Sequence, residues 1–209
     1  MTRVFSHFLF PRYGEGFSYW SHQSVFYPKL ITKNLYLRNP VNKDWKVWKN
    51  LRSESKKFLE PWEPVWQVDS LSKLSYRRRV NRYAKDAKED TGYAFLIFSR
   101  KDNVLLGGIN ISNVVRGARM SCSIGYWIGE RHARKGYMFE AATKVIDYIF
   151  NDLKLCRIEA GCIPNNHASA RLLRSLGFQE EGYAREYLKI NGKRHDHILF
   201  SLLADDGNN

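Results

Sequence analysis

The chain has few cysteines, and their pattern argues against two kinds of structural cross-link. The three cysteines are Cys122, Cys156 and Cys162. They are odd in number, no two of them have CxxC spacing, and no histidine or carboxylate stands at zinc-ligand spacing from them. An odd, unpaired set predicts reduced thiols rather than a disulfide framework. Without ligand spacing a zinc site is not expected, and we predict no bound metal.

Long apolar runs and targeting signals are also missing. No run approaches the roughly 18 residues that indicate a membrane span. The short apolar stretch at Phe8–Phe10 is interrupted by Pro11 and Arg12, and no small-residue cleavage site follows it. Together with reduced thiols, this pattern predicts a cytoplasmic protein.

Acidic residues are scarce relative to basic ones. Asp and Glu total 21 against 34 Lys and Arg, a formal net charge of +13. Such an excess favours an anionic partner, namely nucleic acid, a ribosome surface or a phosphorylated cofactor, although a basic face can simply keep a protein soluble. With 209 residues, 44% of them hydrophobic, the chain is suited to one domain with one core.

The pattern along the chain divides it into three segments. Residues 1–29 hold nine aromatics without a period of 2 or 3.6, which indicates an irregular arm. Residues 30–203 carry regular strand and helix patterns and form the predicted domain. Residues 204–209 are a polar tail, and the chain has no internal repeats or low-complexity tracts.

Periodicity within the domain predicts a sheet interrupted by helices. Strands are expected at 35–38, 93–99, 104–113, 120–128 and 157–163, with two final strands joined at Asn191-Gly192. Helices are expected at 44–52, 72–88, 136–153 and from about 169 to Gly177. Pro61 and Pro64 predict that 58–66 is a loop without regular helix or sheet. This order indicates a single α/β or α+β domain.

The most informative stretch runs from Tyr126 to Met138, where a strand ends, a basic glycine-containing loop follows and an amphipathic helix begins. Such a junction turns free backbone N–H groups toward one point, and the helix dipole adds about half a positive charge there. This geometry suits a pyrophosphate, and Arg131, Arg134 and Lys135 would strengthen it. An ordinary solvated turn is the alternative, but the P-loop and GxGxxG motifs, which would offer another explanation, are absent.

These residues resemble the GNAT acetyltransferases. That family's acyl-CoA loop follows R/Q-x-x-G-x-G/A, matched here by 131–136, and its N-x-x-S and L-G-F elements are matched by Asn166–Ser169 and Leu176–Phe178. The family usually has glycine where this chain has Arg134, and glycine permits positive φ or close backbone approach. The resemblance implies a GNAT fold, a mixed, mostly antiparallel sheet of about seven strands flanked by about four helices.

The resemblance is sharper to the RimJ-type branch, which acetylates the N-terminal alanine of a small-subunit ribosomal protein. Matching strings lie at 58–65, 112–117, 135–141 and 181–188, and the similarity covers about 30–203 but not the first 29 residues. It implies acetyl transfer from acetyl-CoA to a protein N-terminal α-amine by direct attack in a ternary complex. The alternatives are a small-molecule amine acetyltransferase and a non-catalytic RNA-binding or ribosome-assembly factor.

The resemblance also implies which residues contact the cofactor. The expected acetyl-CoA-binding residues are Tyr126, Trp127, Ile128, Arg131, Arg134, Lys135, Gly136, Tyr137, Met138, Asn166 and Ser169. A backbone N–H near Trp127 and Ile128 is the expected oxyanion donor. Asn166 is equally suited to be an N-cap, and Ser169 is either a donor to the departing sulfur or an ordinary helix-surface serine.

The attacking amine must lose a proton, because an ammonium cannot attack. Relatives in another branch use a glutamate and a tyrosine that flank the N-x-x-S element, but the matching positions here are Gly161 and Leu173. Glu186 is the preferred proton acceptor, and Glu63 and Glu159 are the other candidates. For Glu186 the alternative is a surface carboxylate.

The substrate side is predicted from the loop at Pro61–Pro64. A proline-stiffened aromatic loop costs little entropy to order, so we expect it to wall the peptide site, with core packing as the alternative. The expected substrate contacts are Trp62, Glu63 and Asn113.

Two further charged sets have simpler explanations beside functional ones. The cations of the second predicted helix suggest a ribosome or rRNA contact or a solvated face: Arg77, Arg78, Arg79, Arg82, Lys85 and Lys88. His195 and His197 share one strand face while Asp196 points away, so we interpret these three as structural.

Overall fold

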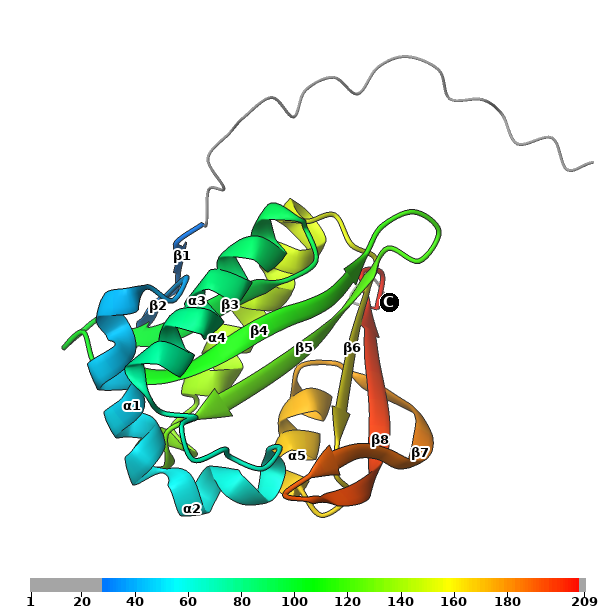
Figure 1. The fold of residues 1–209 in the computed structure, drawn as a ribbon. Coiled ribbons are helices and arrows are strands. Elements are labelled where there is room, and N and C mark those ends of the chain that lie inside the picture. The colour runs from blue at the N-terminus through cyan, green and yellow to red at the C-terminus, as the bar shows by residue number, and fades with distance from the viewer. Residues whose placement is uncertain (1–27, 207–209) are drawn as a thin grey trace, which may run out of the picture.

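The computed structural model describes residues 28–206 (Figure 1). The predicted arm at 1–29 lies outside the described residues except for its last two, and so do residues 207–209 of the predicted tail. Among the described residues, none of the helices combines the length and the apolar character needed to cross a bilayer.

Eight strands form one sheet in the order β1-β2-β3-β4-β5-β6-β8-β7. The strands are β1 Leu30–Ile31, β2 Leu35–Arg38, β3 Tyr93–Ser99, β4 Leu105–Val115, β5 Ser121–Ile128, β6 Arg157–Cys162, β7 Gln179–Ile190 and β8 Lys193–Leu203. All neighbours are antiparallel except β5 and β6. This confirms the mixed, mostly antiparallel sheet, with one strand more than the predicted seven because the two-residue β1 is too short to show a period.

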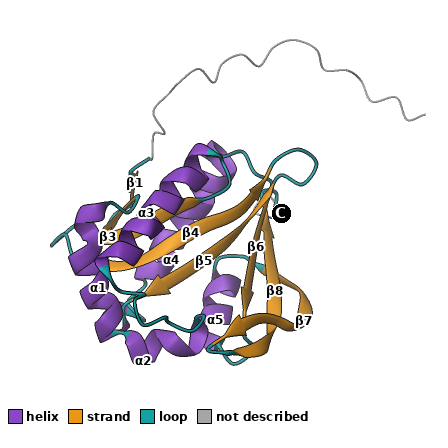
Figure 2. Cartoon of the chain, viewed as in Figure 1, coloured by secondary structure: helices purple, strands orange, loops and turns teal. Residues whose placement is uncertain are grey.

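Five α-helices cover the two faces of this sheet within residues 28–206. They are α1 Trp45–Glu54, α2 Lys56–Leu59, α3 Lys73–Lys88, α4 Tyr137–Asp147 and α5 His167–Ser175. In Figure 1, α1, α2 and α3 lie in front of the sheet and α4 lies behind it, and Figure 2 shows the same two layers coloured by type. The structure therefore has one helix more than the predicted four, because α2 was not expected.

The helix α2 corrects the prediction for residues 58–66. Phe58 and Leu59 are helical, and a 3₁₀ turn, η2, follows at Glu60–Trp62 with Pro61 in it. Proline is tolerated in the first turn of a helix, where its missing N–H has no acceptor to lose. The prediction of an irregular loop is correct only after Trp62.

Two apolar clusters hold the helices onto the sheet. Side chains alternate between the two faces of β3. Phe95 and Ile97 therefore lie in the larger cluster, which also contains residues of α4 and α5. Leu96 and Phe98 lie in the smaller cluster, which also contains residues of α1 and α3. Since both of its faces are covered, β3 is a nearly continuous apolar run rather than an alternating one. The sheet is thus a rigid middle layer with helices on either side.

The parallel pair β5 and β6 separates soon after it forms. The two strands pair only at Ser121 with Arg157, Cys122 with Ile158, and Ser123 with Glu159. Beyond Ser123, β5 pairs only with β4, and beyond Glu159, β6 pairs only with β8. Figure 2 shows the two arrows spreading apart toward α5. The sheet is therefore open in its middle, between residues 124–128 and 160–162.

A buried ion pair holds the start of α1. Asp44 is 4% exposed and accepts hydrogen bonds from Nη1 and Nη2 of Arg38 at 2.7 and 2.6 Å and from the Val41 N–H at 2.9 Å. The bidentate geometry makes this pair stronger than an exposed one. This ion pair fixes the orientation of α1 relative to the preceding strand β2.

We predict that Asp44→Asn lowers the free energy of unfolding in urea by about 3 kcal/mol, because Arg38 keeps its charge and loses its counter-ion. The control is Glu89→Gln, whose carboxylate is exposed and lies 3.8 Å from Lys85. That change should cost less than about 1 kcal/mol. Equal losses in the two variants would contradict this role of Asp44.

Candidate active site

A cavity of about 810 Å³ occupies the opening between β5 and β6. Its walls come from α2 and η2, the end of β5, the loop before α4, the end of β6 and the start of α5. Ten of the predicted cofactor residues line it: Tyr126, Trp127, Ile128, Arg134, Lys135, Gly136, Tyr137, Met138, Asn166 and Ser169. The structure therefore brings together two segments that lie about forty residues apart in the chain.

One end of the cavity is the loop that enters α4. Gly136 is the N-cap with φ of +80°, and a Cβ there would meet nothing within 4 Å. No side chain caps the helix, so the first-turn N–H groups of Tyr137, Met138 and Phe139 have no intrahelical acceptor. With the helix dipole and the exposed Lys135, this end of the cavity suits a diphosphate.

Arg134 occupies the loop in a conformation that favours glycine. Its φ is +60°, in the left-handed region that costs a residue with a side chain about 1 kcal/mol. The side chain is exposed and beside the cavity. The loop thus keeps the backbone geometry expected of glycine and gains a cation.

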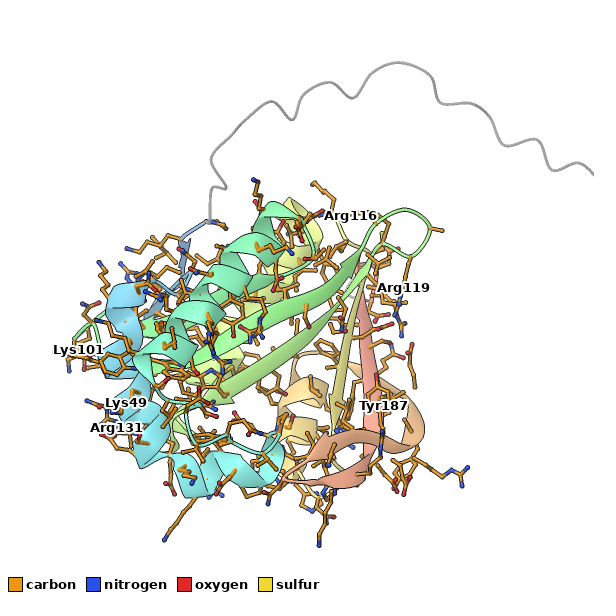
Figure 3. The ribbon with its side chains drawn as sticks, in the orientation of Figure 1. Lys49, Lys101, Arg116, Arg119, Arg131 and Tyr187 are labelled. Carbon is orange, nitrogen blue, oxygen red and sulfur yellow. The ribbon has the colours of Figure 1, made fainter. Side chains whose placement is uncertain are left out.

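Arg131 does not line the cavity. Its Nη1 lies 3.1 Å from the Glu54 carboxylate at the end of α1, and its Nε donates to Nε2 of His132 at 3.1 Å. Figure 3 shows Arg131 at the outer edge of the molecule beside α1. This predicted cofactor residue joins the loop to α1 instead.

The backbone of β5 presents two N–H groups to the opening. The Gly129 N–H donates to the Leu106 carbonyl on β4 at 2.8 Å, in the same register as the rest of the β4–β5 ladder. Since donors alternate along a strand, Trp127 also donates toward β4, while Tyr126 and Ile128 point the other way. Of the predicted oxyanion pair, Ile128 is the one that faces the cavity.

Ser169 and Tyr126 form a hydroxyl pair across the cavity wall. Their side-chain oxygens are 2.8 Å apart. Burial raises the pKa of Tyr126 to about 12, so the phenol keeps its proton. Asn166 is the N-cap of α5, with Oδ1 accepting from the Ser169 N–H at 3.1 Å. The predicted cap is thus present, and Asn166 also lines the cavity.

The three candidate carboxylates lie in different settings. Glu63 lines the cavity, but its two oxygens accept from Arg52, at 2.8 and 2.5 Å, and one also accepts from Trp66 Nε1 at 2.8 Å. Glu159 is bound by Arg157 and Arg119, which hold its pKa below the ordinary value against the opposing effect of burial.

Glu186 is exposed, outside the cavity lining, in the irregular stretch of β7 between Ala184 and Leu188. Its φ is +47° and its N–H donates to Asp196 at 2.8 Å. The strand pattern does not reveal this irregularity, because a bulge inserts residues without changing composition.

The residues expected to contact the substrate also differ in whether they line the first cavity. Trp62 lines the cavity and is 38% exposed. Asn113 lies near the far end of β4, where its Nδ2 donates to Ser123 Oγ at 3.3 Å, and it is not among the lining residues. A register shift between Ser112 and Val115 turns this part of the strand away.

A second cavity of about 460 Å³ lies under α1 and α3 and shares Glu63, Gly125, Tyr126 and Trp127 with the first. Two buried donors line it without a hydrogen-bond acceptor in the described part of the chain, the Tyr76 hydroxyl and Nε of Arg52. The sequence analysis did not identify them, because the spacing of Tyr76 on its helix indicates only a buried face.

Arg52 lies among aromatic rings at this junction. Its guanidinium carbon is 5.9, 4.4 and 4.9 Å from the ring centroids of Trp48, Trp66 and Trp127. Cation–π contacts and the Glu63 carboxylate together hold a charge in a largely apolar setting.

The other charged residues that the sequence pattern singled out lie outside or beside the first cavity. On α3, Arg77, Arg78, Arg82, Lys85 and Lys88 are exposed, whereas Arg79 turns inward over the Trp48 ring.

His197 lines the first cavity and is 3% exposed, which its sequence pattern did not indicate. Within the described residues there is no group of three or more His, Cys, Asp and Glu placed to hold a metal ion.

We predict that Arg134→Gly is more stable than Arg134→Ala by about 1 kcal/mol, because only glycine adopts positive φ freely. Both changes remove the same charge, so both should weaken CoA binding by no more than about fivefold, as expected for one exposed ion pair. Thermal unfolding and CoA titration check the two effects separately. A sharply lower Kd in Arg134→Gly alone would show that arginine hinders the loop.

Comparisons with known proteins agree with this geometry. Residues 34–179 match the acetyltransferase (GNAT) domain model. A probable N-acetyltransferase of Bacillus subtilis, YjcK, is 37% identical over 85% of this chain and 98% of its own length. The uS5-alanine N-acetyltransferase of Escherichia coli is 36% identical over 85% of this chain and 92% of its own.

A solved structure of Mycobacterium smegmatis RimJ in complex with CoA-disulfide has a TM-score of 0.78 and 30% identity, covering 82% of this chain and 83% of that one. The domain match spans more than half of the chain and the relatives align over most of theirs, so the chain belongs to the GNAT acetyltransferase family.

Proposed function

We propose that this acetyltransferase transfers the acetyl group of acetyl-CoA to the α-amine of a protein N-terminus, namely the N-terminal alanine of a small-subunit ribosomal protein. One observation carries the proposal: a cavity suited to a diphosphate and a second cavity with free donors meet at the end of β5. The 36% identity to a uS5-alanine N-acetyltransferase supports this choice of substrate class. Such a substrate places the reaction in the cytoplasm.

Acetyl-CoA fits the first cavity by the chemistry of its walls. The N–H groups at the start of α4, with Lys135 and Arg134, would hold the diphosphate, and Asn166 would meet the chain beyond it. Acetyl-CoA supplies the thioester, and the protein supplies position and charge. Holding the amine and the thioester in line accounts for much of the rate gain in such a ternary complex.

The chain's own groups match the charges that develop during transfer. The N–H groups of Tyr126 and Ile128 face the opening and are suited to stabilise an oxyanion. The Ser169 hydroxyl, held by the protonated Tyr126 phenol, is placed to donate to the departing sulfur. As the raised pKa of Tyr126 keeps this pair protonated at neutral pH, it acts as a donor there.

A peptide explains the second cavity better than a small polyamine does. The Tyr76 hydroxyl and Nε of Arg52 are buried donors that a backbone carbonyl would satisfy. Both oxygens of Glu63, which lines both cavities, accept from Arg52, so this carboxylate is already engaged and is poorly placed to pair with the several ammonium groups of a polyamine. Trp62 lines the first cavity next to Glu63, which lines both.

The direct test is an acetyl-transfer assay with labelled acetyl-CoA and a panel of amines. We expect transfer to a peptide that begins with alanine and none to spermidine or an aminoglycoside. Intact-mass spectrometry of small-subunit ribosomal proteins should show one added acetyl group on the substrate. Transfer to spermidine but not to the peptide would contradict a protein substrate, and RNA binding without any turnover would indicate a non-catalytic factor.

We predict that Tyr76→Phe raises KM for the alanine peptide about five- to tenfold, the worth of one hydrogen bond, without changing the Kd of CoA. Stability should stay the same or rise, because the lost hydroxyl has no partner in the described chain. The control Tyr36→Phe removes a hydroxyl that bonds to Asn103, away from both cavities, and should leave KM unchanged. An unchanged KM in Tyr76→Phe would remove the second cavity from peptide binding.

A further inference from the structure

Deprotonation of the amine is the one step that the residues above do not account for. Among the titratable side chains that line the first cavity, Glu63 is bound by Arg52 and Trp66. Burial raises the pKa values of Tyr126 and Cys162, so neither readily becomes a base.

Two of the three histidines that line the cavity belong to its cofactor end. His132 follows β5 in the loop before α4, and its Nε2 accepts from Arg131 Nε. His167 is the first residue of α5 and is exposed. The third, His197, is on β8 and belongs to neither segment.

His197 is fixed in orientation by hydrogen bonding. Its Nδ1 lies 3.0 Å from the His195 carbonyl oxygen, which can only accept, so Nδ1 carries a proton and Nε2 of the neutral ring holds the lone pair. The Tyr187 ring packs edge-on at 5.5 Å between centroids. Figure 3 shows Tyr187 over the β7 and β8 end of the molecule.

The imidazole of His197 lies at the wall of the cavity, with its Cδ2–Nε2 edge beside Gly161. The residue is only 3% exposed, yet it is among the residues that line the cavity. Its neighbour Cδ2 lies 3.8 Å from where a Cβ on Gly161 would be, and Gly161 lines the cavity. Because residue 161 is glycine, no side chain at that position separates the imidazole edge from the cavity.

We propose that His197 is a catalytic residue whose Nε2 takes the proton from the substrate ammonium. Nε2 removes a proton from the substrate ammonium, and the electrons of the broken N–H bond stay on the amine nitrogen as a lone pair. This lone pair then forms the bond to the thioester carbonyl carbon. The carbon–sulfur bond then breaks with its electron pair on sulfur, which takes the second amine proton, and the imidazolium releases its proton to water. This inference rests on amine acetylation as proposed above, but not on which amine is used.

The groups around the ring leave it free to accept a proton. Tyr187 packs on it from β7, and on β8 itself Asp196 is engaged by the Tyr183 hydroxyl at 2.7 Å and the Glu186 N–H. From β6, the neighbouring Gly161 carries no charge. Activity should therefore fall at low pH, where a protonated base cannot accept a second proton.

The test compares His197→Gln with wild type and with His195→Gln, which changes a histidine on the same strand outside the cavity lining. We expect His197→Gln to lower kcat for the alanine peptide about 100-fold or more and to lose the acidic limb of the kcat/KM profile. The Kd of CoA should stay within about twofold, and imidazole should restore part of the activity of His197→Ala. His195→Gln should keep both the rate and the limb.

Two outcomes would decide against the proposal. A His197→Gln enzyme with near-normal kcat and the same acidic limb would show that another group takes the proton. Loss of CoA binding in parallel with activity, without rescue of His197→Ala by imidazole, would assign His197 a packing role only. Glu186→Gln, measured alongside, should keep the limb if His197 is the base. A wild-type protein that acetylates spermidine but no peptide would contradict the proposed substrate while leaving the test of His197 intact.

Discussion

The separation of β5 from β6 is the constraint on which the site depends. Two parallel strands that stop pairing after Ser123 and Glu159 leave main-chain N–H and carbonyl groups inside the domain without sheet partners. Buried main-chain groups must be satisfied, so the opening calls for a ligand that can accept from β5. The cavity and the N–H groups of Tyr126 and Ile128 that face it both follow from this break in the ladder.

The two sides of the opening differ in the source of their positive charge. On the cofactor side, the charge comes from backbone, through the start of α4 and a loop that holds Gly136 and Arg134 at positive φ. On the acceptor side, the charge is a side chain, Arg52, held by three tryptophan rings and Glu63. These environments differ as the proposed function requires, one suited to a strongly hydrated diphosphate and the other to a nearly neutral peptide backbone.

The basic composition affects catalysis through the carboxylates. Glu63, Glu159 and Glu181 are each bound by arginine, and the pKa of Glu181 falls to about 2 because Arg157 donates to it. A carboxylate that accepts from a guanidinium is a weak base. His197 differs from these carboxylates, because its Nδ1 is held by a main-chain carbonyl, that of His195.

Local patterns were enough to predict most of the fold and many of the residues that line the first cavity. The apolar run at 93–99 indicates a strand, Asn191-Gly192 indicates the last hairpin, and the basic strand-to-helix loop indicates the junction that enters α4. These features depend on residues close together in the chain. Only the tertiary structure decided where β5 and β6 part, that Arg131 turns to α1, and that His197 on β8 faces Gly161 on β6. Contacts between distant strands depend on register and on bulges, which leave no periodic trace in the sequence.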